Sequence, residues 1–314
     1  MPLVSIVVPL YNKAPYVLRT LESVAAQTVT DFEVIVVDDG SSDGSADLVA
    51  KFADPRFKLL RQANAGPGAA RNRGLREASA PHVAFIDADD VWLPRFLEEN
   101  LGVFERYPTS GAVVCGWTKY PSGSRQTEYW RTRGVVEGPF LISKGATPGR
   151  LFAMLAFMNP STILAKSEVI RRWGGFYEDR CLYGEDTTLW LKILLNEPMY
   201  FNLHALSKLD VEASELCRNY RGARPIEPFL LDPRILREAC PKTLLPLLER
   251  LLKVFACKTA AMLGFWGEWR QARELVRRFV SSGDWRIPFF VPAVVSSSPF
   301  ITPIGWLVRP FVRR

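Results

Sequence analysis

The residues with the clearest capacity for chemistry are three aspartates in one short stretch, Asp87-Ala88-Asp89-Asp90. Asp90 alone has an ordinary explanation, because it could cap a helix that begins near Trp92. Three carboxylates this close repel one another, however, unless a cation or a hydrogen-bond network compensates their charge. Their hard oxygen atoms favour a divalent metal ion, and we expect one that also contacts phosphate.

Polar residues also follow two earlier apolar runs. The first run ends in Pro9-Leu10-Tyr11-Asn12 and the second in Asp38-Asp39-Gly40-Ser41-Ser42-Asp43. Taken alone, the second stretch could be a turn followed by a helix cap. Ligands of doubly wound α/β sheets bind beyond the carboxyl ends of the parallel strands, so we expect all three polar stretches to face one cleft.

The segment from Asn64 to Gly74 is rich in glycine, and its first glycines precede a helix that carries Arg71 and Arg73. Arginine at this place could pair with phosphate. The glycines follow the third strand rather than the first, and arginine stands where a third glycine would be needed. A dinucleotide-binding dehydrogenase is therefore disfavoured.

Two further carboxylates, Glu185 and Asp186, directly precede the helical stretch Thr187 to Leu195. Asp186 could simply cap that helix. Alternatively it could accept a proton, since a helix N-terminus favours the ionised carboxylate that a base requires.

The elements that must position these residues alternate between short apolar runs and helical patterns, which predicts an α/β fold with a largely parallel sheet flanked by helices. Beyond residue 117 the pattern loosens, and we expect strands at 161–165 and 199–203 around the helix at 187–195. The strands expected earlier are Val4–Leu10, Phe32–Val37, Phe57–Leu60, Val83–Ile86 and Ala112–Cys115.

Five motifs occur in one order: Val-Ser-Ile-Val-Val-Pro-Leu-Tyr-Asn, Val-Val-Asp-Asp-Gly-Ser-Ser-Asp, Ala-Arg-Asn-Arg-Gly, Asp-Ala-Asp-Asp and Gly-Glu-Asp. Over residues 3–210 the sequence closely resembles family 2 glycosyltransferases with the GT-A fold. The resemblance implies a nucleotide-sugar-binding half at 1–117 and an acceptor-side half at 118–210. We expect residues 211–314 to form a helical, basic extension.

The resemblance also implies roles for individual residues on the donor side. Pro9, Tyr11 and Asp39 would contact the nucleoside, with Asp39 at the base edge. Arg71 would lie near the base or the phosphates of the donor.

The same resemblance implies that Asp89 binds Mg2+ or Mn2+ and, through it, the donor diphosphate, with Asp87 and Asp90 in support. A metal there stabilises the charge that builds on the leaving nucleoside diphosphate. Asp186 would be the base that deprotonates the acceptor, with Glu185 beside it, and the anomeric configuration would invert.

The expected activity is transfer of a sugar, with a UDP-sugar as the favoured donor, to a hydroxyl of a glycan or lipid-linked acceptor. Single addition is favoured, because the Gln-x-x-Arg-Trp motif of processive relatives is absent. A nucleotidyltransferase remains an alternative, although Tyr11-Asn12-Lys13 stands where its basic glycine-rich loop would be. A non-catalytic sugar-nucleotide-binding protein is the other alternative, but it would have no use for Glu185 and Asp186.

Composition limits the class of protein and its compartment. The chain has 314 residues, 48% of them hydrophobic, which suffices for a substantial core. Its 5 cysteines are widely and irregularly spaced, which predicts neither a zinc site nor a disulfide framework and fits a reducing cytosol. We recognise no secretion signal and expect no nucleic-acid partner.

The net charge of +7 belongs mainly to the C-terminal end, and the segment 287–308 there carries no charge. Its four prolines disfavour a membrane-spanning helix. We expect this segment to lie in the membrane interface, with Trp306 and Phe311 inserted and three arginines on anionic headgroups (Arg309, Arg313 and Arg314). This predicts a cytoplasmic protein attached peripherally to the inner face of the cytoplasmic membrane.

Overall fold

The computed structural model describes residues 1–124, 126–143, 145–179, 181, 183–213, 222–284 and 289–297. The chain divides into two compact units. The first comprises Met1–Ser143 and Ala153–Arg218, and the second comprises Lys144–Phe152 and Asn219–Arg314.

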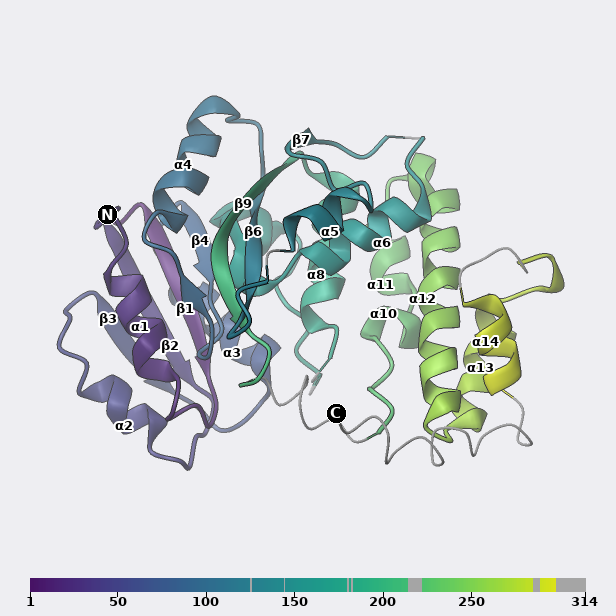
Figure 1. The fold of residues 1–314 in the computed structure, drawn as a ribbon, viewed down its shortest axis with the longest axis horizontal. Helices are drawn as coiled ribbons and strands as arrows, with labels where there is room; N and C mark the ends of the chain where they lie inside the picture. The colour runs from purple at the N-terminus through teal and green to yellow at the C-terminus, as the bar shows by residue number, and fades with distance from the viewer. Residues whose placement is uncertain are drawn as a thin grey trace. The chain divides into compact units, whose positions relative to one another are not determined.

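Among the described residues, the first unit is built on one 9-stranded sheet of order β3-β2-β1-β4-β8-β6-β9-β5, with β7 paired to β9 (Figure 1). The strands are β1 Val4–Leu10, β2 Phe32–Asp38, β3 Phe57–Arg61, β4 His82–Phe85, β5 Val91–Trp92, β6 Ala112–Tyr120, β7 Gly138–Phe140, β8 Ile163–Lys166 and β9 Met199–Asp210. Strands β3, β2, β1 and β4 run parallel, as does the pair β6–β9. Strand β8 enters antiparallel between β4 and β6, and β5 and β7 are antiparallel to β9. The α/β class is confirmed, and its parallel part is the half that carries β1, β2 and β4.

Alternate residues of the central strands bury opposite faces of the sheet. Val34 and Val36 pack in the cluster that includes α1, α2 and α4, whereas Ile35 and Val37 pack with α3 on the other face (Figure 1). The helices of this part are α1 Val17–Ala25, α2 Ser45–Ala50, α3 Pro67–Glu77, α4 Phe96–Arg106, α5 Thr127–Arg131, α7 Ser167–Arg172 and α8 Glu185–Asn196. Helix α6, Pro148–Phe157, begins in the second unit and ends in the first. A short 3-10 segment, η1, spans Pro160–Thr162.

A close approach of backbone to side chain fixes α3 on the sheet. A Cβ atom at Gly74 would lie 2.3 Å from Cγ1 of Val7 on β1. Only glycine therefore lets α3 pack this closely, and the helix carries Arg71 toward the carboxyl end of the strands.

Two local expectations are wrong. The segment after Asp90 forms the short strand β5 rather than a helix, and the helix begins only at Phe96. Strand β9 continues well past Leu203 to Asp210, because it stays paired with β6 to the end.

The described part of the second unit is helical. Its elements are α10 Pro228–Leu231, α11 Arg234–Arg237, η2 Lys242–Leu244, α12 Leu245–Phe265, α13 Trp269–Phe279, η3 Ser282–Asp284 and α14 Phe290–Ser296. Helix α12 buries an apolar face that includes Leu248, Leu251, Leu252 and Phe255. The expected interfacial segment is described only at 289–297, and the remainder of it, with the arginines at the chain's end, lies outside the described residues.

The part of the chain that the structure describes contains no helix with both the length and the apolar character required to cross a bilayer.

Candidate active site

The aspartate cluster follows β4, and the surrounding protein already compensates part of its charge. Oδ2 of Asp89 lies 2.8 Å from Nζ of Lys13, which also donates a hydrogen bond to the carbonyl of Ala213 at 2.9 Å. Asp90 is buried, and its Oδ1 accepts a hydrogen bond of 2.9 Å from the backbone N–H of Asp210. Asp90 is thus held in place by the end of β9 and does not cap a helix.

Burial and mutual repulsion disfavour ionisation in this cluster. Burial raises the pKa of Asp89, Asp87 raises it further, and Lys13 opposes both. Burial also raises the pKa of Asp90 well above its usual value, with Asp89 and Asp87 as the next causes. A further positive charge beside these aspartates would therefore oppose their mutual repulsion and favour their ionised forms.

Arg71 joins the end of β4 to the start of α8. Its Nη2 donates to Oδ1 of Asp87 at 2.7 Å, and its Nη1 donates to Oε1 of Glu185 at 2.8 Å. The guanidinium also lies 5.2 Å from the centre of the Phe176 ring. Burial alone would lower the pKa of Arg71, but Asp87 and Glu185 outweigh it and raise that pKa, so the side chain stays charged.

Helix α8 begins at Glu185, directly after Gly184, whose φ of 79° is left-handed. Gly184 occupies the N-cap position, so the interpretation of Asp186 as the cap is wrong. Asp186 lies in the first turn instead, and its Oδ1 accepts a hydrogen bond of 2.6 Å from the N–H of Thr187.

Burial raises the pKa of Asp186 to about 7, Glu185 raises it as well, and Arg71 is the main opposing charge. The helix N-terminus favours the ionised carboxylate, while burial and the adjacent Glu185 disfavour it. A carboxylate with a pKa near 7 is matched to proton transfer at neutral pH.

Asp39 is buried and holds the loop between β3 and α3. Its Oδ1 accepts hydrogen bonds from Nε2 of Gln62 at 2.8 Å and from the N–H of Ala65 at 2.9 Å. Its Oδ2 accepts one from the N–H of Gly66 at 2.8 Å. A role in shaping this loop was not foreseen from the sequence, and any contact with a nucleoside would use the acceptor capacity that remains.

The ends of β1 and β2 are tied together. The N–H of Asn12 donates to Oγ of Ser41 at 3.0 Å, and Oδ1 of Asn12 accepts from the N–H of Ser42 at 2.8 Å. Pro9 lies on β1 in register with Val37 of β2, and Tyr11 follows with 47% of its surface exposed. The structure therefore brings Pro9 and Tyr11, at the end of β1, to the edge of the sheet where Asp39 follows β2.

Sequence reasoning missed Arg19 and Asp210, which support the aspartate cluster. Nη2 of Arg19 donates to the carbonyl of Asp89 at 2.7 Å and pairs with the carboxylate of Asp210. The rings of Tyr16 and Tyr120 lie 5.1 and 5.0 Å from that guanidinium. Asp210 lies at the end of a strand, as the other predicted site residues do. The sequence pattern, however, predicted that this strand would end at Leu203, so Asp210 was not recognised.

The side chains offer oxygen donors to a metal without forming a complete set. Within the described ranges, no group of three or more His, Cys, Asp or Glu side chains is arranged to hold a metal ion. Asp87, whose side chain is 30% exposed, and Asp89, which is mostly buried with its side chain 10% exposed, both present hard oxygens. Among the described residues these oxygens do not complete a coordination shell, so a divalent cation held here would need further ligands, such as the phosphates of a substrate.

The sheet order and the flanking helices define the α/β class with the GT-A architecture of nucleotide-diphospho-sugar transferases. Residues 5–160 match the family model described as Glycosyl transferase family 2, and the chain belongs to that family. The resemblance noted in the sequence is thereby confirmed.

Curated relatives agree with this assignment. An uncharacterised glycosyltransferase of Rickettsia prowazekii is 27% identical over 216 residues, which cover 68% of this chain and 65% of the relative. One from Nostoc is 41% identical over 113 residues, covering 35% of each chain. YibD of Escherichia coli, also an uncharacterised glycosyltransferase, is 35% identical over 154 residues, 46% of this chain and 44% of the relative. The matches thus span less than two thirds of these relatives.

Two solved structures share the fold over nearly the whole chain. Staphylococcus aureus TarS 1-349 in complex with UDP-GlcNAc has a TM-score of 0.65 and 18% identity, with 99% of this chain and 92% of that chain covered. The mannosyltransferase PcManGT from Pyrobaculum calidifontis, in complex with GDP-Man and Mn2+, has a TM-score of 0.62 and 20% identity, with 100% and 88% covered. Because these two proteins hold different nucleotide sugars, the shared fold leaves the donor open.

Proposed function

We propose that the protein is a glycosyltransferase that moves a sugar from a nucleoside-diphosphate donor, with UDP-sugars favoured, onto a hydroxyl group of an acceptor. One observation carries the proposal: Arg71 joins Asp87 at the end of β4 to Glu185 at the start of α8, at 2.7 and 2.8 Å. The guanidinium of Arg71 thereby connects Asp87, which we expect on the donor side, with Glu185, which we expect on the acceptor side.

On the donor side, Asp89 and Asp87 would hold Mg2+ or Mn2+ together with the diphosphate, with Asp90 behind them. The metal would stabilise the negative charge that builds on the leaving nucleoside diphosphate. Support comes from the oxygen donors after β4 and from a structural neighbour that contains Mn2+. Pro9, Tyr11 and Asp39 would hold the nucleoside at the ends of β1 and β2.

On the acceptor side, Asp186 would take the proton of the attacking hydroxyl. The acceptor oxygen forms a bond to the anomeric carbon while the bond from that carbon to the diphosphate oxygen breaks, and the proton passes to the carboxylate of Asp186. A single displacement of this kind inverts the anomeric configuration. A pKa of about 7 suits this role, whereas Glu185 is occupied by Arg71 and would support the base.

Residues 118–210 would present the acceptor, which we infer to be a glycan or a lipid-linked sugar extended by one unit. The C-terminal extension would attach the protein peripherally to the inner face of the cytoplasmic membrane. The basic charge of that extension supports this part of the proposal.

The decisive experiment is incubation of the protein with UDP-, dTDP- and GDP-sugars, with Mg2+, Mn2+ or a chelator, and measurement of the free nucleoside diphosphate. Metal-dependent release from one donor class is expected, and it should disappear in the Asp186→Asn variant. A nucleotidyltransferase would instead release pyrophosphate from a nucleoside triphosphate and a sugar phosphate. A non-catalytic binding protein would bind a donor and release nothing, and either result would overturn the proposal.

A further inference from the structure

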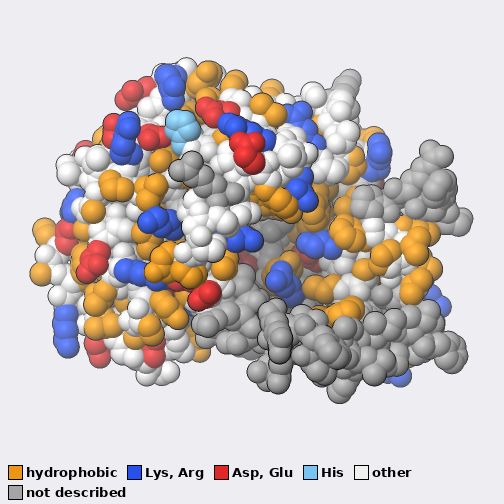
Figure 2. All heavy atoms as spheres, viewed as in Figure 1, with side chains coloured by type: hydrophobic (Ala, Val, Ile, Leu, Met, Phe, Trp, Pro, Cys, Tyr) orange, Lys and Arg blue, Asp and Glu red, His pale blue; other side chains and the backbone are white. Residues whose placement is uncertain are grey.

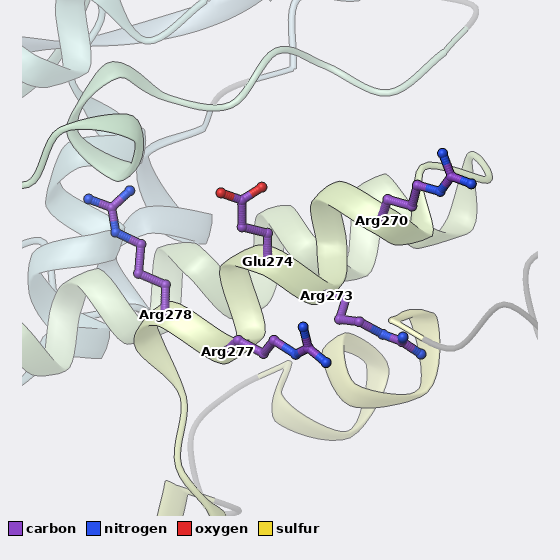
Figure 3. Close-up of a pocket in the computed structure, with 5 residues that line it drawn as sticks. All are labelled: Arg270, Arg273, Glu274, Arg277 and Arg278. Atoms are coloured by element: carbon purple, nitrogen blue, oxygen red, sulfur yellow. The ribbon is translucent and has the colours of Figure 1, made fainter.

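Helix α13 carries four arginines on its outward side while its inner side is buried. The inner residues are Ala272, Leu275 and Phe279. The arginine stripe comprises Arg270, Arg273, Arg277 and Arg278, which line a hollow of about 460 Å³ together with Glu274. Figure 3 shows Arg273 and Arg277 extending side by side from one flank of the helix, with the others spread along it.

The charge of this stripe is poorly balanced by the protein. In the described residues, none of the four guanidiniums forms an ion pair with a carboxylate, and Glu274 is the single acid that lines the hollow. Nε of Arg273 donates to the carbonyl of Ser297 at 3.2 Å, and Nη1 of Arg278 donates to that of Leu231 at 2.9 Å. These bonds orient the two side chains without neutralising them, and the nearby carboxylate of Asp232, which attracts Arg278, is already paired with Arg234. Like charges three or four residues apart on a helix repel, so bound anions would relieve this repulsion.

The neighbouring helix α14 turns an apolar face outward. Val291, Val294 and Val295 are 62%, 41% and 40% exposed, whereas Ala293 is buried. Their spacing places the three valines on one side of the helix. Helix α14 packs against α12 and α13, and hydrophobic side chains gather over it in the space-filling view (Figure 2). The bond from Arg273 to Ser297 ties the arginine stripe to the end of this helix.

Arginines beside an exposed apolar helix face have the composition of a surface that lies in a bilayer interface. A small anion in water would engage the guanidiniums and leave the valines exposed. A phospholipid surface engages both the arginines and the valines. Guanidinium groups bind its phosphates in a bidentate way, and the apolar side chains enter the boundary of the acyl region.

We propose that the surface formed by the arginine stripe and the outward valines of α14 binds the phosphate headgroups of an anionic phospholipid bilayer. This deepens the proposed peripheral attachment by giving it a site within the described fold, in addition to the chain's end. It is independent of the chemistry of sugar transfer.

The test is sedimentation of the full-length protein with phosphatidylcholine vesicles that contain or lack phosphatidylglycerol. The triple variant Arg270→Gln, Arg273→Gln, Arg277→Gln should bind the anionic vesicles roughly 100-fold more weakly at low salt, since each basic residue near such a surface contributes a factor of about five. The matched control is Arg106→Gln, Lys242→Gln, Arg250→Gln, which removes the same charge from exposed positions elsewhere. The control should lose far less affinity. A variant with serine at the three outward valines should also bind more weakly.

Equal affinity of the arginine variant and the control would overturn the proposal, as would tight binding of inorganic pyrophosphate by the stripe without any preference for vesicles. Thermal unfolding of each variant shows whether the fold is retained. Release of nucleoside diphosphate by the arginine variant without vesicles should equal that of the wild type. If the wild type releases none from any donor while the arginine variant still loses vesicle binding, the proposed transferase function fails and the lipid site stands.

Discussion

Replacing Arg71 by methionine should change both the stability of the fold and the pH at which the enzyme works. Its side chain is only 5% exposed and it forms ion pairs with both Asp87 and Glu185, whose side chains are 30% and 10% exposed. Breaking a buried pair by removing one partner costs about 3–5 kcal/mol. Because water reaches Asp87 more readily than Glu185, we expect a loss of about 3 kcal/mol in the free energy of unfolding, the lower end of that range.

The kinetic effect follows from the sign of the charge removed. Arg71 lowers the pKa of Asp186, which burial and Glu185 raise to about 7. Without Arg71 the pKa of Asp186 rises further, so less of the base is ionised at neutral pH and the acid limb of the rate profile moves to higher pH. We expect a shift of about one pH unit or more, with activity partly regained in alkaline buffer.

The assay is nucleoside diphosphate release under kcat conditions across the pH range, with urea unfolding measured alongside. Arg71→Lys is the matched control, because lysine restores the charge but cannot bridge two carboxylates with one planar group. It should recover most of the pH profile and only part of the stability. If Arg71→Met keeps the wild-type acid limb while still losing stability, Arg71 is structural and does not set the pKa of the base.

Three further outcomes are expected. Asp89→Ala should abolish transfer and sharply weaken metal-dependent nucleotide binding measured by calorimetry, and wild-type turnover in that variant would refute the metal assignment. Asp186→Asn should keep donor binding and lose transfer. It should also be more stable than the wild type above pH 7 and equal to it below pH 4, because the wild type alone must ionise a carboxyl whose pKa burial raises from 3.8 to about 7. Asp39→Ala should raise the donor KM more than it lowers kcat and should lower Tm, since three donors lose their acceptor; an unchanged KM would remove Asp39 from the nucleoside site.

The ends of β1, β2 and β4 could be predicted from the sequence because short apolar runs and the polar residues after them are local features. The order of strands could not, since β8 lies between β4 and β6 although many residues separate it from both along the chain. Its apolar run looks like that of any buried strand, and only tertiary packing decides whether such a strand enters parallel or antiparallel.

The partners of the charged side chains could not be predicted from the sequence either. Asp39 could be recognised as a polar residue at a strand end, but its three donors lie 23 to 27 positions away in a loop whose conformation the sequence leaves open. Lys13 was noticed only as a residue that argues against another class of enzyme. Its distance of 2.8 Å from Asp89 depends on how β1 and β4 pair.

The distinction between Glu185 and Asp186 also arises from tertiary structure. Two adjacent carboxylates at a helix start are nearly equivalent in sequence, yet successive side chains on a helix point about 100° apart. Arg71, held close to the sheet by Gly74, can therefore reach Glu185 directly, while it acts on Asp186 only through space. One carboxylate is thereby fixed in an ion pair, and the other is left with a pKa near neutrality. Different surroundings can in this way give a supporting role and a base role to two neighbouring residues of similar chemistry. The different surroundings of the proposed base and its neighbour thus depend on an arginine that lies 115 residues before Asp186 in the chain.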